Sequence, residues 1–291
     1  MPIQQMLLGV GGVFEADPGQ AVLSPGTTSW TCPAGVTSIS VLAIGAGGAS
    51  GTSLNGPGGG GMGYRNNITV SPGTSYAVSV PDSQPEGSTG GNGGTAYLRD
   101  ENGNTWVEAY GGGGAGSTSG GNYVGEGGGG SGGDGAVGQS GWGNTKSGGG
   151  AGGAGGYNGD GGDGGAPGST GSSGAANSGA AGGGAGGTSN QPVGAAQGRA
   201  GGGVGILGVG STGAGGAYVQ SGGYDYPQEG EPGSGGVNNG VYDGGTYGGG
   251  GASGVKINGT TYNGEQSGKG VIRIMWPGNE RSYPSTRTAD E

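Results

Sequence analysis

The sequence contains no histidine, one cysteine and one phenylalanine. Without histidine, the chain lacks the side chain that serves most often as a catalytic base and as a metal ligand. We therefore expect no enzyme activity, no catalytic residues, no metal site and no cofactor. The single Cys32 excludes an intrachain disulfide, and we interpret it as a buried strand residue rather than a nucleophile.

Apolar residues are also scarce. They make up 29% of the chain, which is too little for a conventional hydrophobic core throughout 291 residues. They cluster before Gly111 and after Ser253, so an ordinary core must come from the two ends. No stretch is long and apolar enough to span a membrane. The first residues lack the basic start and long apolar run of a secretory signal, so we expect synthesis in a cytoplasm.

Basic residues are few as well. Nine Lys and Arg stand against nineteen Asp and Glu, which gives a net charge of -10. This balance disfavours binding to nucleic acid or to an anionic lipid surface. Neither is expected as a partner.

Glycine is abundant, with 92 residues, and it is periodic. It occupies every third position from Gly150 to Gly174, and the same register occurs from Gly129 to Gly141. Three residues per turn is the repeat of the polyproline II helix, and glycine leaves an edge without Cβ where another backbone can approach. For residues 111–253 we therefore predict a bundle of polyglycine II helices. Collagen would need far more proline than the 14 residues present; a flexible linker does not require so regular a register.

The residues on both sides of this region predict β-strands, because β-branched and apolar residues alternate with turn signals. Asn102-Gly103 and Asn258-Gly259 are each typical of a hairpin. The expected strands cover residues 28–32, 37–46, 64–70, 75–80, 95–99, 105–110, 255–257, 260–262 and 270–276. The predicted fold is all-β with little or no α-helix.

An apolar strand such as 270–276 needs a sheet to join. We therefore expect a β-sandwich base made from both ends of the chain, with the glycine-rich region inserted in it. The expected organisation is a docking segment at 1–19, the sandwich at 20–110 plus 254–276, the polyglycine II bundle at 111–253 and a polar tail at 277–291.

Two groups of acidic or amide side chains are candidates for cation binding or acid–base chemistry. Asp160 and Asp163 share one edge of a threefold helix, and nothing near them suggests a nucleophile or an apolar pocket. We interpret them as solvating residues. Asp100, Asn102 and Asn104 resemble the start of a calcium loop, but the required glycine and glutamate are missing. A hairpin turn explains them.

Aromatic residues interrupt the glycine runs, often beside Asn, Asp or Gln. Tyr and Trp with adaptable polar neighbours are typical of recognition loops; alternatively, they cap the bundle by stacking over glycine backbone. The candidate receptor-binding residues are Tyr123, Trp142, Tyr218, Tyr224, Tyr226, Tyr242 and Tyr247. At the start of the chain, Met6, Leu7 and Leu8 form a candidate peg for docking on another protein.

The glycine-rich region resembles the receptor-binding adhesins at the tips of T-even-like phage long tail fibres. In that family, polyglycine II helices form a layered bundle with recognition loops at its far end. The run WTCPAGVTSISVLAIGAGG from Trp30 to Gly48 is similar to the opening of glycine-rich phage tail proteins. The stretches Met1–Gly9 and Val271–Gly278 are similar to the termini of virion proteins from cyanophages and other marine phages.

The resemblance implies a phage virion protein that binds a host-cell surface protein or glycan and docks on other virion proteins through Met6, Leu7 and Leu8. It implies a monomer or a trimer. The T-even-like adhesins carry a separate attachment domain ahead of the bundle, whereas here the expected sandwich straddles it.

Three alternatives remain open. The protein could be a purely structural virion component, such as a capsid decoration or a connector of fibre or baseplate. An ice-binding polyglycine protein would expose a flat row of small residues, which the bulky or acidic Tyr157, Asp160 and Asp163 disfavour. A polysaccharide depolymerase would need a carboxylate pair in a cleft.

Overall fold

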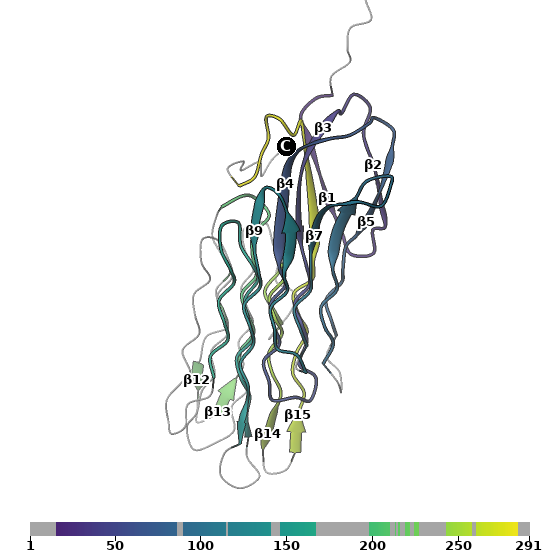
Figure 1. The fold of residues 1–291 in the computed structure, drawn as a ribbon. Helices are drawn as coiled ribbons and strands as arrows, with labels where there is room; N and C mark the ends of the chain where they lie inside the picture. Colours follow the sequence, from purple (N-terminus) through teal and green to yellow (C-terminus); the bar gives the residue numbers. More distant parts are fainter. Residues whose placement is uncertain are drawn as a thin grey trace, which may run out of the picture.

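The computed structural model describes residues 16–85, 90–114, 116–140, 146–166, 198–209, 213, 215, 219–221, 224–226, 243–257 and 260–284. These residues contain β-strands and no helix, and all their strand pairs are antiparallel. The all-β prediction is therefore confirmed for this part of the chain. Figure 1 shows an elongated molecule, with the larger sheets at one end and long extended segments that run to the other.

Two five-stranded sheets form the upper part of Figure 1. Sheet A has the order β1 (Gly19–Leu23), β16 (Val271–Trp276), β3 (Ser38–Ile44), β4 (Met62–Thr69) and β9 (Gly128–Gly130). Sheet B has the order β2 (Ser29–Thr31), β5 (Ser75–Ser79), β6 (Ala96–Arg99), β7 (Thr105–Ala109) and β8 (Tyr123–Gly125).

The two sheets share one hydrophobic core. Side chains alternate between the faces of a strand, so Ile39 and Val41 of β3 point to one face and pack with residues of sheet B such as Leu98 and Val107. All four are fully buried. The sheets are therefore stacked as a sandwich, and β16 from the C-terminal part of the chain lies in the middle of sheet A.

The second face of sheet A is also covered. Leu42 and Ile44 of β3 pack there against Ala154, Tyr157 and Val204, which come from the glycine-rich region. Sheet A is thus the middle of three layers. This explains why β3 and β16 are apolar on both faces.

The pairing of strands differs in two respects from a simple succession of hairpins. β4 and β5 belong to different sheets, so the turn at residues 71–74 crosses between the sheets instead of closing a hairpin. β8 and β9 follow Gly111, yet each completes one of the two sheets. Residues of the glycine-rich range therefore contribute directly to the sandwich.

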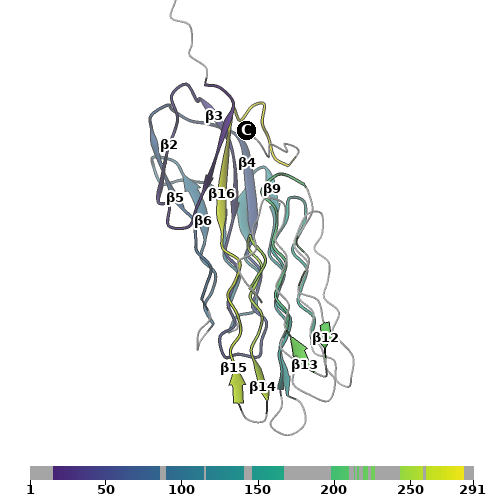
Figure 2. The same cartoon turned by 180° about the vertical axis from the view of Figure 1, so that it is seen from behind.

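The other end of the molecule carries short strands. One small sheet contains β10 (Gln139–Ser140), β11 (Lys146–Ser147), β14 (Val255–Ile257) and β15 (Thr260–Tyr262), in that order. A separate pair consists of β12 (Val219–Ser221) and β13 (Tyr224–Tyr226). Figures 1 and 2 both place β12 to β15 far from the sandwich, at what we call the distal end.

The described part of the expected polar tail, residues 277–284, packs on the sandwich. The side-chain amide of Asn66 donates a 2.7 Å hydrogen bond to the carbonyl oxygen of Tyr283, and the Asn66 Oδ1 accepts a 2.9 Å bond from the Tyr283 amide. Tyr283 is buried in the cluster on the outer face of sheet A. The apolar ring of Tyr283 thus anchors a segment whose composition is otherwise polar.

Candidate binding site on the glycine-rich scaffold

Residues 149–156 form backbone hydrogen bonds with three different neighbouring segments. The amides of Gly149, Gly152 and Gly155 donate to the carbonyl oxygens of Leu54, Pro57 and Gly60. The amides of Gly150, Gly153 and Gly156 donate to those of Gly165, Gly162 and Gly159. The amides of Ala151 and Ala154 donate to those of Arg199 and Gly202. Successive residues therefore face different neighbours, and every third residue faces the same one.

The same alternation occurs in segments that lie before Gly111. The amides of Gly56 and Gly59 donate to the carbonyl oxygens of Ala136 and Gly133, those of Gly58 and Gly61 to Gly113 and Tyr110, and that of Gly60 to Gly248. We call this network of glycine segments the scaffold. It includes residues 56–61, which lie between β3 and β4, as well as segments that follow Gly111. It runs from sheet A toward the distal end (Figure 1).

Close approach of backbones explains the demand for glycine. A Cβ added at Gly152 would overlap the carbonyl group of Gly133, and one at Gly201 would overlap that of Gly152. Alanine is present where the side chain has space: Ala154 packs in the buried cluster on sheet A. The scaffold is therefore stabilised mainly by backbone hydrogen bonds, each worth about 1 kcal/mol net.

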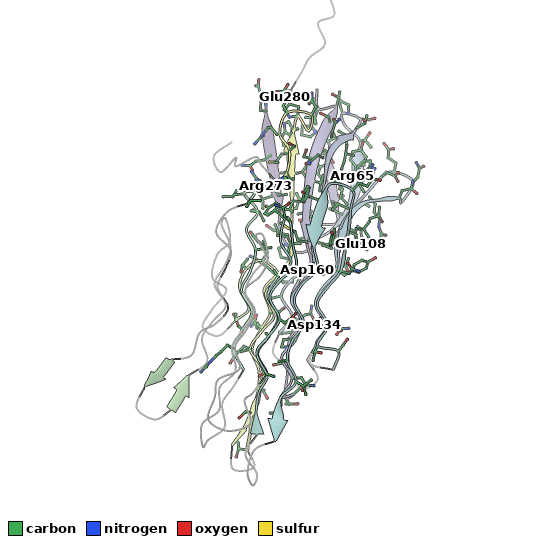
Figure 3. All side chains as sticks on the ribbon, turned by 60° about the vertical axis from the view of Figure 1, so that its left-hand side comes forward. Arg65, Glu108, Asp134, Asp160, Arg273 and Glu280 are labelled. Carbon is green, nitrogen blue, oxygen red and sulfur yellow. The ribbon has the colours of Figure 1, made fainter. Side chains whose placement is uncertain are left out.

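Exposed carboxylates also take part in the scaffold. The Oδ1 atoms of Asp160 and Asp163 accept hydrogen bonds from the backbone amides of Ser131 and Asp134, at 2.7 and 2.9 Å. Asp134 Oδ1 in turn accepts a 2.7 Å bond from the amide of Gly120. The interpretation of Asp160 and Asp163 as merely solvating was incomplete, because each carboxylate takes the place of a carbonyl acceptor at the edge of the scaffold. Figure 3 shows Asp134 and Asp160 on this part of the molecule.

Two candidate receptor-binding residues lie away from the distal end. Tyr123 is half-buried in β8, against the backbone of Gly63 and Gly129. Tyr247 is only 9% exposed and belongs to the buried cluster on sheet A. In this structure neither ring is presented at the distal end: Tyr123 packs against glycine backbone, and Tyr247 is buried in an apolar cluster.

Two other candidates lie at the distal end. Tyr224 and Tyr226 are the first and last residues of β13, paired in register with Ser221 and Val219 of β12. The structure therefore brings these two positions together on one short hairpin. The remaining candidates lie outside the described residues: Trp142, Tyr218, Tyr242, Met6, Leu7 and Leu8.

Tyr157 differs from its sequence interpretation. That interpretation places the bulky side chain on the outside of a bundle, where it disfavours an ice-binding face, but the residue is 1% exposed. Its ring lies 6.1 Å from that of Tyr64 and 6.0 Å from that of Tyr283. Burial and the neighbouring Tyr283 raise the pKa of Tyr157 well above its ordinary value. The expectation was wrong because the face of the glycine segment that carries this residue is covered by sheet A.

Arg273 is a further residue whose role the sequence did not predict. Its fully buried side chain leaves β16 and donates hydrogen bonds from Nε to Gln20 Oε1 at 2.8 Å and from a terminal nitrogen to the carbonyl oxygen of Ile206 at 2.7 Å. It thereby joins β1, β16 and the scaffold. The sequence does contain a signal for this role, because Arg273 is a lone arginine within the apolar run Val271–Trp276.

Comparisons with known proteins give no relative: no protein-family model matches the chain, and neither does any curated protein. The described residues include no helix of the length and apolarity needed to cross a bilayer. They also contain no cluster of histidine, cysteine, aspartate and glutamate suited to a metal ion. The function must therefore be inferred from the arrangement of the residues themselves.

Proposed function

We propose that this protein is a non-enzymatic phage virion component of the tail-fibre adhesin type. The sandwich is its base, the scaffold is a bundle of polyglycine II helices, and the distal end binds a protein or glycan on the host-cell surface. The observation that carries the proposal is the hydrogen bonding of scaffold segments to three neighbours in a period of three residues.

The period supports the polyglycine II assignment on geometric grounds. A helix with three residues per turn directs successive amides about 120° apart and makes no internal hydrogen bonds. Its amides must therefore find partners on surrounding chains. Residues 149–156 fulfil this requirement on three sides, whereas a β-strand has hydrogen-bonding partners on two sides only.

Such a scaffold suits the presentation of binding residues. Sites held by rigid elements are positioned more accurately than sites on long loops. The β12–β13 hairpin places Tyr224 and Tyr226 at the distal end, with Asp225 between them. Tyrosines amid polar residues provide contact area at low entropic cost, which supports recognition of a surface receptor there.

A double substitution, Tyr224→Ser with Tyr226→Ser, tests the proposal. In particles that carry it, we expect adsorption to the host to fall at least about tenfold, since removal of an aromatic hot spot costs more than 1.4 kcal/mol. Tyr110→Ser, at an exposed position beside sheet B, is the control and should adsorb normally. Unchanged adsorption of the double variant at equal particle number would refute the receptor-binding role.

A purely structural virion role is the second candidate. The burial of Tyr157 and Tyr247 favours it, because these aromatic interruptions of the glycine pattern serve packing. In that case the double variant would lower the yield of assembled particles, and those that form would adsorb normally. Counting particles before the adsorption assay separates the two functions.

A further inference from the structure

A cavity of about 280 Å³ lies at the sandwich, at the end opposite the distal strands. Its polar lining comes from Thr37, Ser38, Asn67, Asn279 and Glu280, and Trp276 forms an apolar wall. Figure 3 shows Glu280 at this end of the molecule, far from Asp134 on the scaffold.

A β-bulge forms one side of the cavity. In the β3–β4 pair, Ile39 is opposite Ile68, but the next matched pair is Val41 with Arg65. The extra residue lets Asn67 adopt a φ of 52°, in the left-handed region. Bulges often re-aim a side chain next to a functional site, and non-glycine residues with such angles concentrate at functional sites. Here Asn67 lines the cavity.

Hydrogen bonds fix the opposite side. The amide of Gly278 donates to the carbonyl oxygen of Ser38 at 3.0 Å, and Ser40 Oγ donates to the carbonyl oxygen of Gly278 at 3.1 Å. Trp276 Nε1 donates to the carbonyl oxygen of Asp17 at 3.1 Å, which fixes the indole ring. The cavity is therefore formed before any ligand arrives, as is usual for small-molecule sites.

Several polar groups of the lining remain available for a ligand. Ser38 Oγ donates to Asn279 Oδ1 at 3.1 Å. Four other groups have no hydrogen-bond partner within the described part of the chain. They are the side-chain nitrogen of Asn279, the side-chain amide of Asn67, the hydroxyl of Thr37 and the carboxylate of Glu280. These groups are exposed, so water solvates them until a ligand replaces it. They provide both donors and acceptors around one aromatic wall.

The geometry points to a binding site for a single uncharged sugar residue. A sugar ring has hydroxyl groups for the amides, the hydroxyl and the carboxylate, and an apolar C–H face for Trp276. The volume is at the lower limit of small-molecule pockets, about 300 Å³, so it admits one ring. Among the described lining residues Glu280 alone is charged, which disfavours acidic sugars. This site is separate from the proposed receptor-binding end and does not depend on it.

Titration of the full-length ¹⁵N-labelled chain with sugars tests the inference. The probes are methyl α-D-mannopyranoside, methyl β-D-galactopyranoside and N-acetylglucosamine, with glucuronate as the acidic comparison. The indole N–H signal of Trp276 is identified by its loss in Trp276→Phe. We expect this signal to shift saturably with at least one neutral sugar and not with glucuronate. No saturable shift with any neutral sugar would overturn the proposal.

Two variants locate the binding. Asn67→Gly removes the amide and keeps a backbone that tolerates φ of 52°, so the fold is retained. We expect it and Asn279→Ala each to weaken binding about fivefold, as for the loss of one hydrogen bond. Glu101→Gln, on the remote β6–β7 turn, should bind like the parent chain. Equal affinity in all the variants would place binding elsewhere and refute the site.

Discussion

The hydroxyl group of Tyr157 donates a 2.9 Å hydrogen bond to the carbonyl oxygen of Gly205. The hydroxyl oxygen of Tyr157 in turn accepts a 3.0 Å bond from the amide of Gly208. One side chain from a glycine run thus satisfies two backbone groups of another segment, while its ring packs against Tyr64 of β4. Tyr157 therefore connects the scaffold to the middle sheet of the molecule.

Tyr157→Phe is expected to lower the free energy of unfolding by about 1–3 kcal/mol, because it leaves buried backbone groups without their partner. Chemical denaturation followed by circular dichroism measures the change. Tyr110→Phe is the matched control: Tyr110 is 42% exposed, and its variant should unfold like the parent. Equal stability of the two variants would contradict the assigned role.

Alkaline pH should destabilise the protein. Burial raises the pKa values of Tyr157 and Tyr283 in the folded state, while in the unfolded chain tyrosine titrates near about 10. Below that pH both the folded and the unfolded chain keep these protons, so the two groups do not lower the free energy of unfolding. Above it the unfolded chain loses protons that the folded chain keeps, so stability falls by up to about 1.4 kcal/mol per pH unit for each group.

Denaturation at a series of pH values from neutral to strongly alkaline checks this expectation. The dependence on pH should be shallower in Tyr157→Phe than in the parent chain, because one of the groups is removed. An identical slope would show that Tyr157 does not contribute.

Gly152→Ala should destabilise the scaffold by about 1–3 kcal/mol, the usual cost of overpacking. The added methyl group would overlap the carbonyl of Gly133 and force neighbouring segments apart. Gly116→Ala is the control, since a Cβ there meets nothing within 4 Å. Thermal unfolding of both variants measures the difference; equal melting temperatures would argue against close backbone packing.

The carboxylates at the scaffold edge allow a crossed experiment. Asp160→Ala should speed hydrogen exchange at the amide of Ser131, and Asp163→Ala at that of Asp134, because each loses its acceptor. An increase of about tenfold corresponds to one charge-assisted hydrogen bond. Each variant is the control for the other. Acceleration at both amides in either variant would indicate general loosening instead.

Most strands near the ends of the chain followed from sequence because local patterns determine them. Asn102-Gly103 predicts the β6–β7 hairpin, and Gly103 has the positive φ of 83° that such turns require. The apolar run before Pro277 predicts a strand within a sheet, and β16 lies inside sheet A.

The choice of partner was harder to predict. The turn after β4 suits a tight reversal, but it leads to the other sheet: β4 pairs with β3 and β9, whereas β5 pairs with β2 and β6. Tyr157 and Tyr247 illustrate the same limit at the candidate site. A tyrosine next to a glycine run suits both an exposed loop and a cover over backbone, and only the packing of sheet A decides between them.

The alternation of three neighbours along residues 149–156 also constrains how the chain lengthens. An insertion of one or two residues would turn every later amide toward the wrong neighbouring segment. An insertion of three residues would leave each later amide directed at the same segment as before. Homologous chains should therefore differ in these segments by multiples of three residues. The turns that connect the segments can differ by any number of residues.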